Sequence, residues 1–89
     1  MNVMNMQERI NTKLEEGFSP ISLNVMNESH LHAGHAGDDG SGESHFRIEI
    51  ESKSFNGVSR VVRERMIHDA LSEEIKIIHA LSISAKPVE

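Results

Sequence analysis

The sequence predicts a two-layer α+β domain, in which helices cover one face of a three-stranded mixed sheet. Apolar residues recur at helical spacing near the N-terminus and again after residue 58, and they alternate with polar residues in three other segments. A helical connection of about 25 residues separates the second and third alternating segments, and crossovers of this kind join parallel strands. The predicted element order is therefore αββααβ.

The first helix is expected over roughly residues 3–16. Apolar residues occupy every fourth position with charged residues between them, which is typical of an amphipathic helix. Gly17 is expected to end the helix, because glycine readily takes the left-handed conformation of a helix C-terminus. The apolar face consists of Met6, Ile10, Leu14 and Phe18.

Two strands follow, and they are expected to pair antiparallel because they are consecutive in the chain. Both show the period of two that gives a strand one apolar face. The apolar residues of the first strand, after Pro20, are Ile21, Leu23 and Val25, and those of the second are Phe46, Ile48 and Ile50.

Residues 27–44, between these strands, read NESHLHAGHAGDDGSGES and show no apolar periodicity. Gly, Ser, Asp and Asn dominate this segment, which predicts a long surface loop rich in histidine and glycine. Loops longer than about 12–15 residues are usually functional or disordered. The loop is therefore the first place to look for function.

The second half of the chain predicts a turn over residues 53–57, a helix from about Ser59 to Leu71 and a final strand over residues 77–85. Ser72 is expected to cap a further short helical turn, SEEI. The longer helix is expected to bury Val62, Met66 and Ala70, and the final strand to place Leu81, Ile83 and Ala85 on one face.

The composition indicates one small domain over residues 1–89 and excludes several classes of site. The chain has no cysteine, which excludes disulfides, thiol nucleophiles and metal ligation by its own sulfur. Nine Lys and Arg against 14 Asp and Glu give a net charge of −5, which disfavours strong sequence-independent binding to nucleic acid. No segment predicts a membrane span, and the N-terminal residues resemble neither a secretory signal nor a transit peptide, so we expect a cytoplasmic protein.

Histidine is the residue type most suited to carry chemistry here, because the chain has six histidines and no Trp, Tyr or Cys. The predicted topology brings the loop and the starts of the second and third strands to one end of the sheet. His45 is expected to point to the exposed face, and His68 to lie on the longer helix, each in a structural or solvated role. The five histidines expected at the shared end are His30, His32, His35, His45 and His79.

These histidines allow more than one interpretation. The loop pattern H-x-H-x-x-H is compatible with solvated side chains or with a metal site, since clustered imidazoles are common ligands. His79, within IIHALSI, is by itself more often a hydrogen-bonded strand-end residue than a ligand. A loop histidine with a strand histidine would supply only two ligands, so water, a carboxylate or the thiolates of a partner would have to complete the site.

The chain resembles the BolA-like family over nearly its whole length. The resemblance rests on NVMNESHLH (24–32), SGESHFRIEIESKSFNGVSRVVRERM (41–66) and HALSISA (79–85), including the pattern F-x-G-x-S-x-V-x-R. It implies a class II KH-like fold with the element order αββααβ, which agrees with the order predicted from periodicity.

The resemblance also implies a partner and a cofactor. Members of the family pair with monothiol glutaredoxins, and a 2Fe–2S cluster bridges the two proteins. The glutaredoxin and glutathione each supply a thiolate, while the BolA-like chain supplies a strand histidine and a loop residue. The strand ligand corresponds to His79, and the loop ligand corresponds best to His32, with His30 and His35 close by. We expect the chain to be a monomer without the cluster, and to be no enzyme.

A second function, DNA binding and transcription regulation through the KH-like surface, would use Arg60, Arg63 and Arg65. The family usually has R-H-R in this helix, whereas this chain has Arg63-Glu64-Arg65, and an acid there should weaken phosphate contacts. The chain also has only three aromatic residues, all Phe, that could stack on bases. A third function, binding of a divalent ion by the loop alone, would not need His79.

Overall fold

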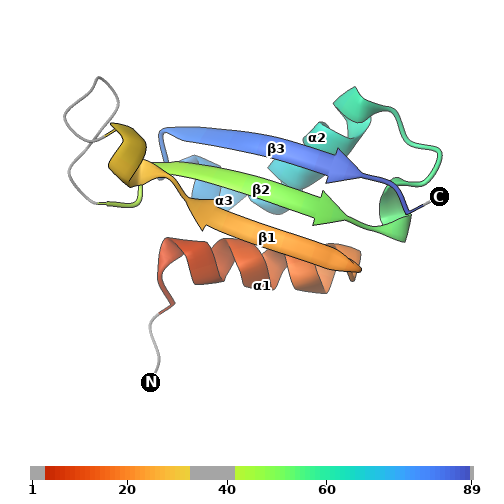
Figure 1. The fold of residues 1–89 in the computed structure, drawn as a ribbon, viewed down its shortest axis with the longest axis horizontal. Helices are drawn as coiled ribbons and strands as arrows, with labels where there is room; N and C mark the ends of the chain where they lie inside the picture. The colour runs from red at the N-terminus through yellow and green to blue at the C-terminus, as the bar shows by residue number, and fades with distance from the viewer. Residues whose placement is uncertain (1–3, 33–41, 89) are drawn as a thin grey trace.

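The computed structural model describes residues 4–32 and 42–88, with only the backbone for residues 31 and 32. The strands form a single sheet, and the helices lie behind it in the view of Figure 1. The elements are α1 (Met6–Phe18), β1 (Ser22–Asn27), the 3-10 turn η1 (Ser29–His32), β2 (His45–Glu51), the 3-10 turn η2 (Lys53–Phe55), α2 (Arg60–Ala70), α3 (Ser72–Ile75) and β3 (Ala80–Lys86).

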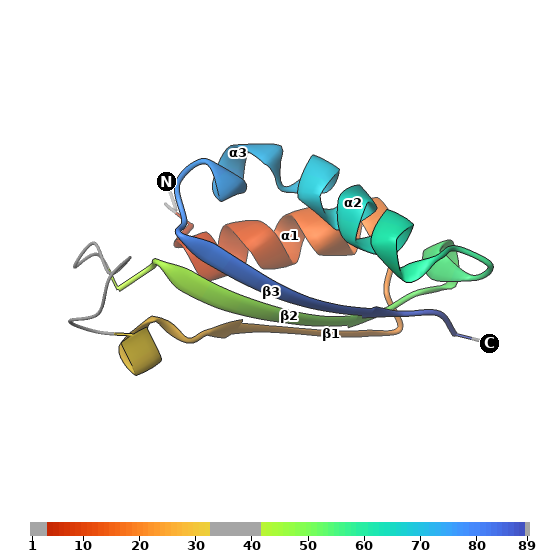
Figure 2. The ribbon, with the colours of Figure 1, turned by 90° about the horizontal axis from the view of Figure 1, so that it is seen from above.

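The sheet has the order β1-β2-β3, with β1 antiparallel to β2 and β2 parallel to β3. Helices α1, α2 and α3 lie on one face of the sheet, and no α-helix of the described residues covers the other face (Figure 2). The predicted fold class is therefore confirmed. The core lies between the layers, and its fully buried aromatic residues are Phe46 from the central strand and Phe55 from η2.

Helix α1 begins later and ends later than the sequence predicts. Asn5 caps it, because the Asn5 side chain accepts a hydrogen bond from the Glu8 N–H at 2.8 Å. Gly17 lies inside the last turn, so its expected role as the helix terminator is wrong. The helix ends at Ser19, which takes a left-handed conformation (φ 44°) and precedes Pro20. Proline disfavours a right-handed helical conformation in the residue before it, which is a local reason for this end.

Three further expectations about side chains are wrong. Ile21 is 61% exposed, because it precedes β1 and lies outside the apolar face formed by Leu23 and Val25. Val62 is 41% exposed, because the buried face of α2 is centred on Ile67, and a residue five positions away points about 140° to one side. Ser72 begins α3 but does not cap it, since Leu71 occupies the cap position.

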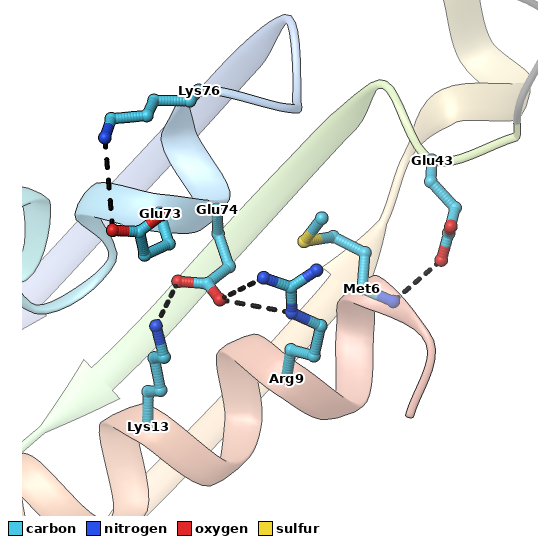
Figure 3. A network of polar contacts seen from close by, with 7 residues as sticks. All are labelled: Met6, Arg9, Lys13, Glu43, Glu73, Glu74 and Lys76. Carbon is cyan, nitrogen blue, oxygen red and sulfur yellow. Dashed lines mark hydrogen bonds and ion pairs between the residues drawn. The ribbon is translucent and has the colours of Figure 1, made fainter. Parts of the chain in front are cut away.

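A buried carboxylate joins α3 to α1. Glu74 has no exposed surface, and its two oxygens accept hydrogen bonds from Lys13 Nζ at 2.8 Å and from Arg9 Nη2 at 2.8 Å (Figure 3). The Glu74 backbone oxygen also accepts hydrogen bonds from the N–H groups of Ile77 and Ile78. Glu74 therefore holds the turn that leads into β3 against the first helix.

The charges around Glu74 determine its protonation. Burial by itself would raise the pKa of Glu74, but hydrogen bonds from Lys13, from its own backbone and from Arg9, together with the charge of Lys13, lower this pKa below the ordinary value of 4.5. Because the folded pKa is the lower one, the carboxylate stabilises the fold above the unfolded pKa. That stabilisation is lost as the pH falls through the folded pKa.

Replacing this carboxylate tests its contribution. Glu74→Gln is expected to lower the free energy of unfolding near neutral pH by about 1.5–3 kcal/mol, the usual contribution of hydrogen bonds to a charged group. The difference from the wild type should shrink as the pH falls through the lowered pKa of Glu74 in the folded state and the wild-type carboxylate takes up a proton. Urea unfolding followed by circular dichroism over this pH range measures both effects.

Glu73→Gln is the matched control, because Glu73 is exposed and lies 3.9 Å from Lys76 Nζ. Its expected effect is within about 0.5 kcal/mol. Equal losses in the two variants would contradict a specific role for Glu74.

Candidate functional site

The two stems of the long loop meet at one end of the sheet, where β1 ends and β2 and β3 begin (Figure 1). Both stems carry the tripeptide Glu-Ser-His, at residues 28–30 and 43–45. Ser29 is 4% exposed, and its Oγ accepts hydrogen bonds from the N–H groups of Ser44 at 2.9 Å and His45 at 3.1 Å. One hydroxyl therefore satisfies two backbone donors of the opposite stem.

Further hydrogen bonds close the same stems. The Glu28 N–H donates to the His45 carbonyl at 2.8 Å, and the Asn27 side chain donates to the Gly42 carbonyl at 2.8 Å. Asn27 Oδ1 also accepts from the Ser29 N–H at 3.0 Å, which positions Ser29. These contacts fix where the chain leaves β1 and where it returns to β2.

The returning stem is also tied to the helical layer. A carboxylate oxygen of Glu43 accepts a hydrogen bond from the Met6 N–H at 2.7 Å, at the first turn of α1 (Figure 3). The first N–H groups of a helix lack partners within the helix, and the helix dipole favours an acidic side chain there. The base of the loop is therefore held by the sheet and by α1.

His79 lies immediately before β3, beside the returning stem. Its N–H donates to the Ser44 carbonyl at 2.8 Å, and its side chain is exposed. The His79 ring packs against the His45 ring, with centroids 5.2 Å apart and planes tilted by 48°. The predicted convergence of strands two and three is thus confirmed for these two histidines, and it follows from the parallel register that pairs His45 with Ala80.

The prediction that His45 is exposed is wrong. His45 is 7% exposed, and its Nδ1 lies 2.7 Å from Ser44 Oγ. Although His45 has the parity of the open face, the neighbouring stem and the His79 ring cover it at this end of the sheet. The duplicated Glu-Ser-His tripeptide is the sequence signal that could have indicated a shared structural role for Ser29 and Ser44.

The loop histidines are described only in part. His30 is exposed within η1, and His32 ends this turn. The His32 side chain and the whole of His35 lie outside the described residues. Within residues 4–32 and 42–88, no three His, Asp or Glu side chains are grouped so that they could hold a metal ion. A complete metal site would therefore need donors beyond the described side chains.

The three arginines of α2 have different surroundings. Arg60 and Arg65 are exposed, and Arg60 lies 3.9 Å from Glu64. Arg63 is half-buried, with Nε donating to the Val58 carbonyl at 2.7 Å and Nη1 to the Ala85 carbonyl at 3.0 Å. Arg63, a candidate DNA-binding residue in the sequence, thus ties α2 to β3 through two backbone carbonyls.

Comparison with known proteins identifies the family. Residues 14–89 match the family described as BolA-like protein. The chain belongs to the BolA-like family. Among the described helices, none is both long enough and apolar enough to cross a membrane.

Solved BolA structures support the fold assignment. BolA1 from Arabidopsis thaliana superposes with a TM-score of 0.85 at 38% identity, covering 97% of this chain and 95% of that one. The BolA domain of SufE1 from the same plant gives a TM-score of 0.84 at 41% identity, covering 98% and 96%.

BolA-like protein 1 from Mus musculus is 47% identical over 78 residues, which are 86% of this chain and 54% of that protein. This chain thus spans about half the length of that relative. Other relatives carry chloroplastic or mitochondrial in their names, so family membership does not determine the compartment, and a cytoplasmic location stays a prediction.

The Ser29 hydroxyl offers a test of how the BolA-like chain holds its loop. Ser29→Ala is expected to lower the free energy of unfolding by about 1–3 kcal/mol, because it leaves the buried N–H groups of Ser44 and His45 without their acceptor. Amide hydrogen exchange at these two residues should accelerate. Ser84→Ala, at an exposed position of β3, is the control and should change stability by less than about 0.5 kcal/mol. Unchanged exchange at residues 44 and 45 would contradict the assigned role.

Proposed function

We propose that this BolA-like protein is a non-enzymatic adaptor that binds a monothiol glutaredoxin and co-ligates a bridging 2Fe–2S cluster in iron–sulfur trafficking or iron regulation. The observation that carries the proposal is the exposed imidazole of His79, held beside the base of a histidine-bearing loop. His79 would be the strand ligand. His32 would be the loop ligand, with His30 and His35 as the alternatives.

The donor set of the chain fits a shared cluster. Imidazole is a suitable ligand for iron, and a 2Fe–2S cluster can take two imidazoles on one of its irons. The chain has no cysteine, so the thiolates on the other iron would come from the glutaredoxin and from glutathione. Replacing thiolate by imidazole raises the reduction potential of a bound cluster.

The surroundings of the two strand-end histidines favour His79 over His45 as the ligand. His79 is exposed, so a partner protein can reach its ring, whereas His45 is buried and has Ser44 Oγ at its Nδ1. The backbone bond from His79 to Ser44 and the packing against His45 limit the freedom of His79. A ligand restrained in this way loses little conformational entropy on binding.

The base of the loop supports the second ligand in the same manner. The hydrogen bonds of Ser29 and Glu28 to the opposite stem, and of Glu43 to α1, hold both ends of the loop close to His79. A loop anchored at a narrow base samples a smaller volume than a free segment of equal length. A histidine on this loop would therefore meet the same iron as His79 at a modest entropic cost.

The proposal predicts a spectroscopic change on mixing. A glutathione-ligated 2Fe–2S monothiol glutaredoxin, titrated anaerobically with this protein, should give a new visible circular-dichroism spectrum that saturates at one equivalent. His79→Ala should alter or abolish the new spectrum, because it removes the strand ligand. Separate substitutions of His30, His32 and His35 by Ala should show which loop histidine contributes.

His68→Ala is the matched control, because His68 is an exposed histidine on α2 and should leave the spectrum unchanged. Far-ultraviolet circular dichroism of each variant separates loss of a ligand from loss of the fold. No spectral change with the wild-type protein would refute the proposal for that glutaredoxin, and an unchanged spectrum with folded His79→Ala would refute the role of His79.

A further inference from the structure

The outer edge of β3 has no neighbouring strand among the described residues. β3 is an edge strand of the sheet, and its register with β2 determines which of its residues bond inward. The Ala80 N–H donates to Ser44, and the Lys86 carbonyl accepts from Ser52, so the even-numbered residues bond to β2. In a strand the backbone groups alternate in direction, so the N–H and C=O groups of residues 81, 83 and 85 point outward.

The side chains in the middle of β3 do not prevent strand addition. From Ala80 to Ala85 the strand reads ALSISA, without a charge or a proline, whereas Lys86 and the following Pro87 stand at its C-terminal end. Natural proteins usually protect edge strands with charged side chains, proline or bulges, because an open edge is a template for another strand. Protection of the middle of this edge therefore has to come from another element.

Arg63 of α2 provides that protection. Its Nη1 donates to the outward Ala85 carbonyl at 3.0 Å, and its Nε is fixed by the Val58 carbonyl at 2.7 Å. The guanidinium thus occupies a position at the edge that an incoming strand would need. Figure 1 shows α2 beside this edge of β3, and a groove of about 270 Å³ between them is lined by Arg60, Arg63, Glu64 and residues 83–86.

We propose that the outer edge of β3 and the adjoining flank of α2 form a pairing surface for a second copy of this chain, and that Arg63 holds this surface closed in the monomer. An antiparallel pair of β3 strands with a two-fold axis at Ile83 brings Leu81 opposite Ala85 of the second copy. The Leu81 N–H of that copy then takes the place of Arg63 at the Ala85 carbonyl.

The charges on the flank of α2 favour a second copy as the occupant. Arg60 and Glu64 lie one helical turn apart on the groove side. A two-fold interface pairs a residue i with j and j with i, so Arg60 of each copy would face Glu64 of the other. A strand added at the edge lies about 4.8 Å from β3, which brings the two α2 helices alongside each other. The surface can therefore pair with its own copy, through the outward backbone groups of β3 and through the opposite charges of Arg60 and Glu64.

The test is the oligomeric state of the full chain without a cluster. Sedimentation velocity over a wide range of concentration compares the wild type with Arg63→Met, which keeps an apolar stem and removes the donors. The dimer dissociation constant of Arg63→Met is expected to be at least about tenfold lower than that of the wild type. The reason is that the dimer of this variant forms without first breaking the hydrogen bond from Arg63 to the Ala85 carbonyl. Arg65→Met, on the exposed side of the same helix, should match the wild type.

A charge exchange tests the arrangement of the dimer. In the Arg63→Met background, Arg60→Glu places acids opposite each other and should weaken the dimer about tenfold, whereas Arg60→Glu combined with Glu64→Arg should restore it. A folded Arg63→Met protein that stays monomeric at all concentrations would overturn the proposal. The proposal would also be overturned if Arg60→Glu alone and Arg60→Glu combined with Glu64→Arg changed the dimer dissociation constant equally. Neither result depends on the glutaredoxin or on the cluster.

Discussion

The parallel pairing of β2 with β3 is the constraint on which the rest of this structure depends. Two parallel neighbours cannot be joined by a hairpin, so the chain must cross over one face of the sheet, and α2 and α3 make this connection. The crossover returns β3 to the end of the sheet at which β2 begins. His45 and His79, 34 positions apart in the sequence, therefore come into ring contact.

Glu74 stabilises the return of the crossover. Its carboxylate is buried against Arg9 and Lys13, and its backbone carbonyl accepts from the two residues that lead toward His79. A buried carboxylate without these partners would be costly, so α1 and α3 must stay in register for the charge to be tolerated. In this way the first helix influences where a histidine near the C-terminus lies.

The candidate site shows how a small chain can hold a long loop without a large core. The stems are joined by the buried Ser29 hydroxyl and by backbone groups. No buried side-chain nitrogen or oxygen in the described part of the chain lacks a hydrogen-bond partner. The described part of the site is thus the base of the loop, next to the His79 ring. The proposed pairing edge of β3 involves a different surface, formed by its outer edge and α2.

The elements and their order can be predicted from the amino-acid sequence, because the period of the apolar residues and the connectivity of the chain are local properties. The spacing of Ile10 and Leu14, the alternation of Phe46 and Ile48, and the length of the crossover were enough to predict the mixed sheet and the end at which His45 and His79 meet. The burial of particular polar residues, in contrast, follows from packing between distant segments. By its alternation with the core residues of β2, His45 should point to the exposed face. Arg63 and Glu74 are charged residues of helices, a kind of residue that usually faces water. Each is placed by contacts with segments distant in the chain, and a periodic pattern carries no information about such contacts.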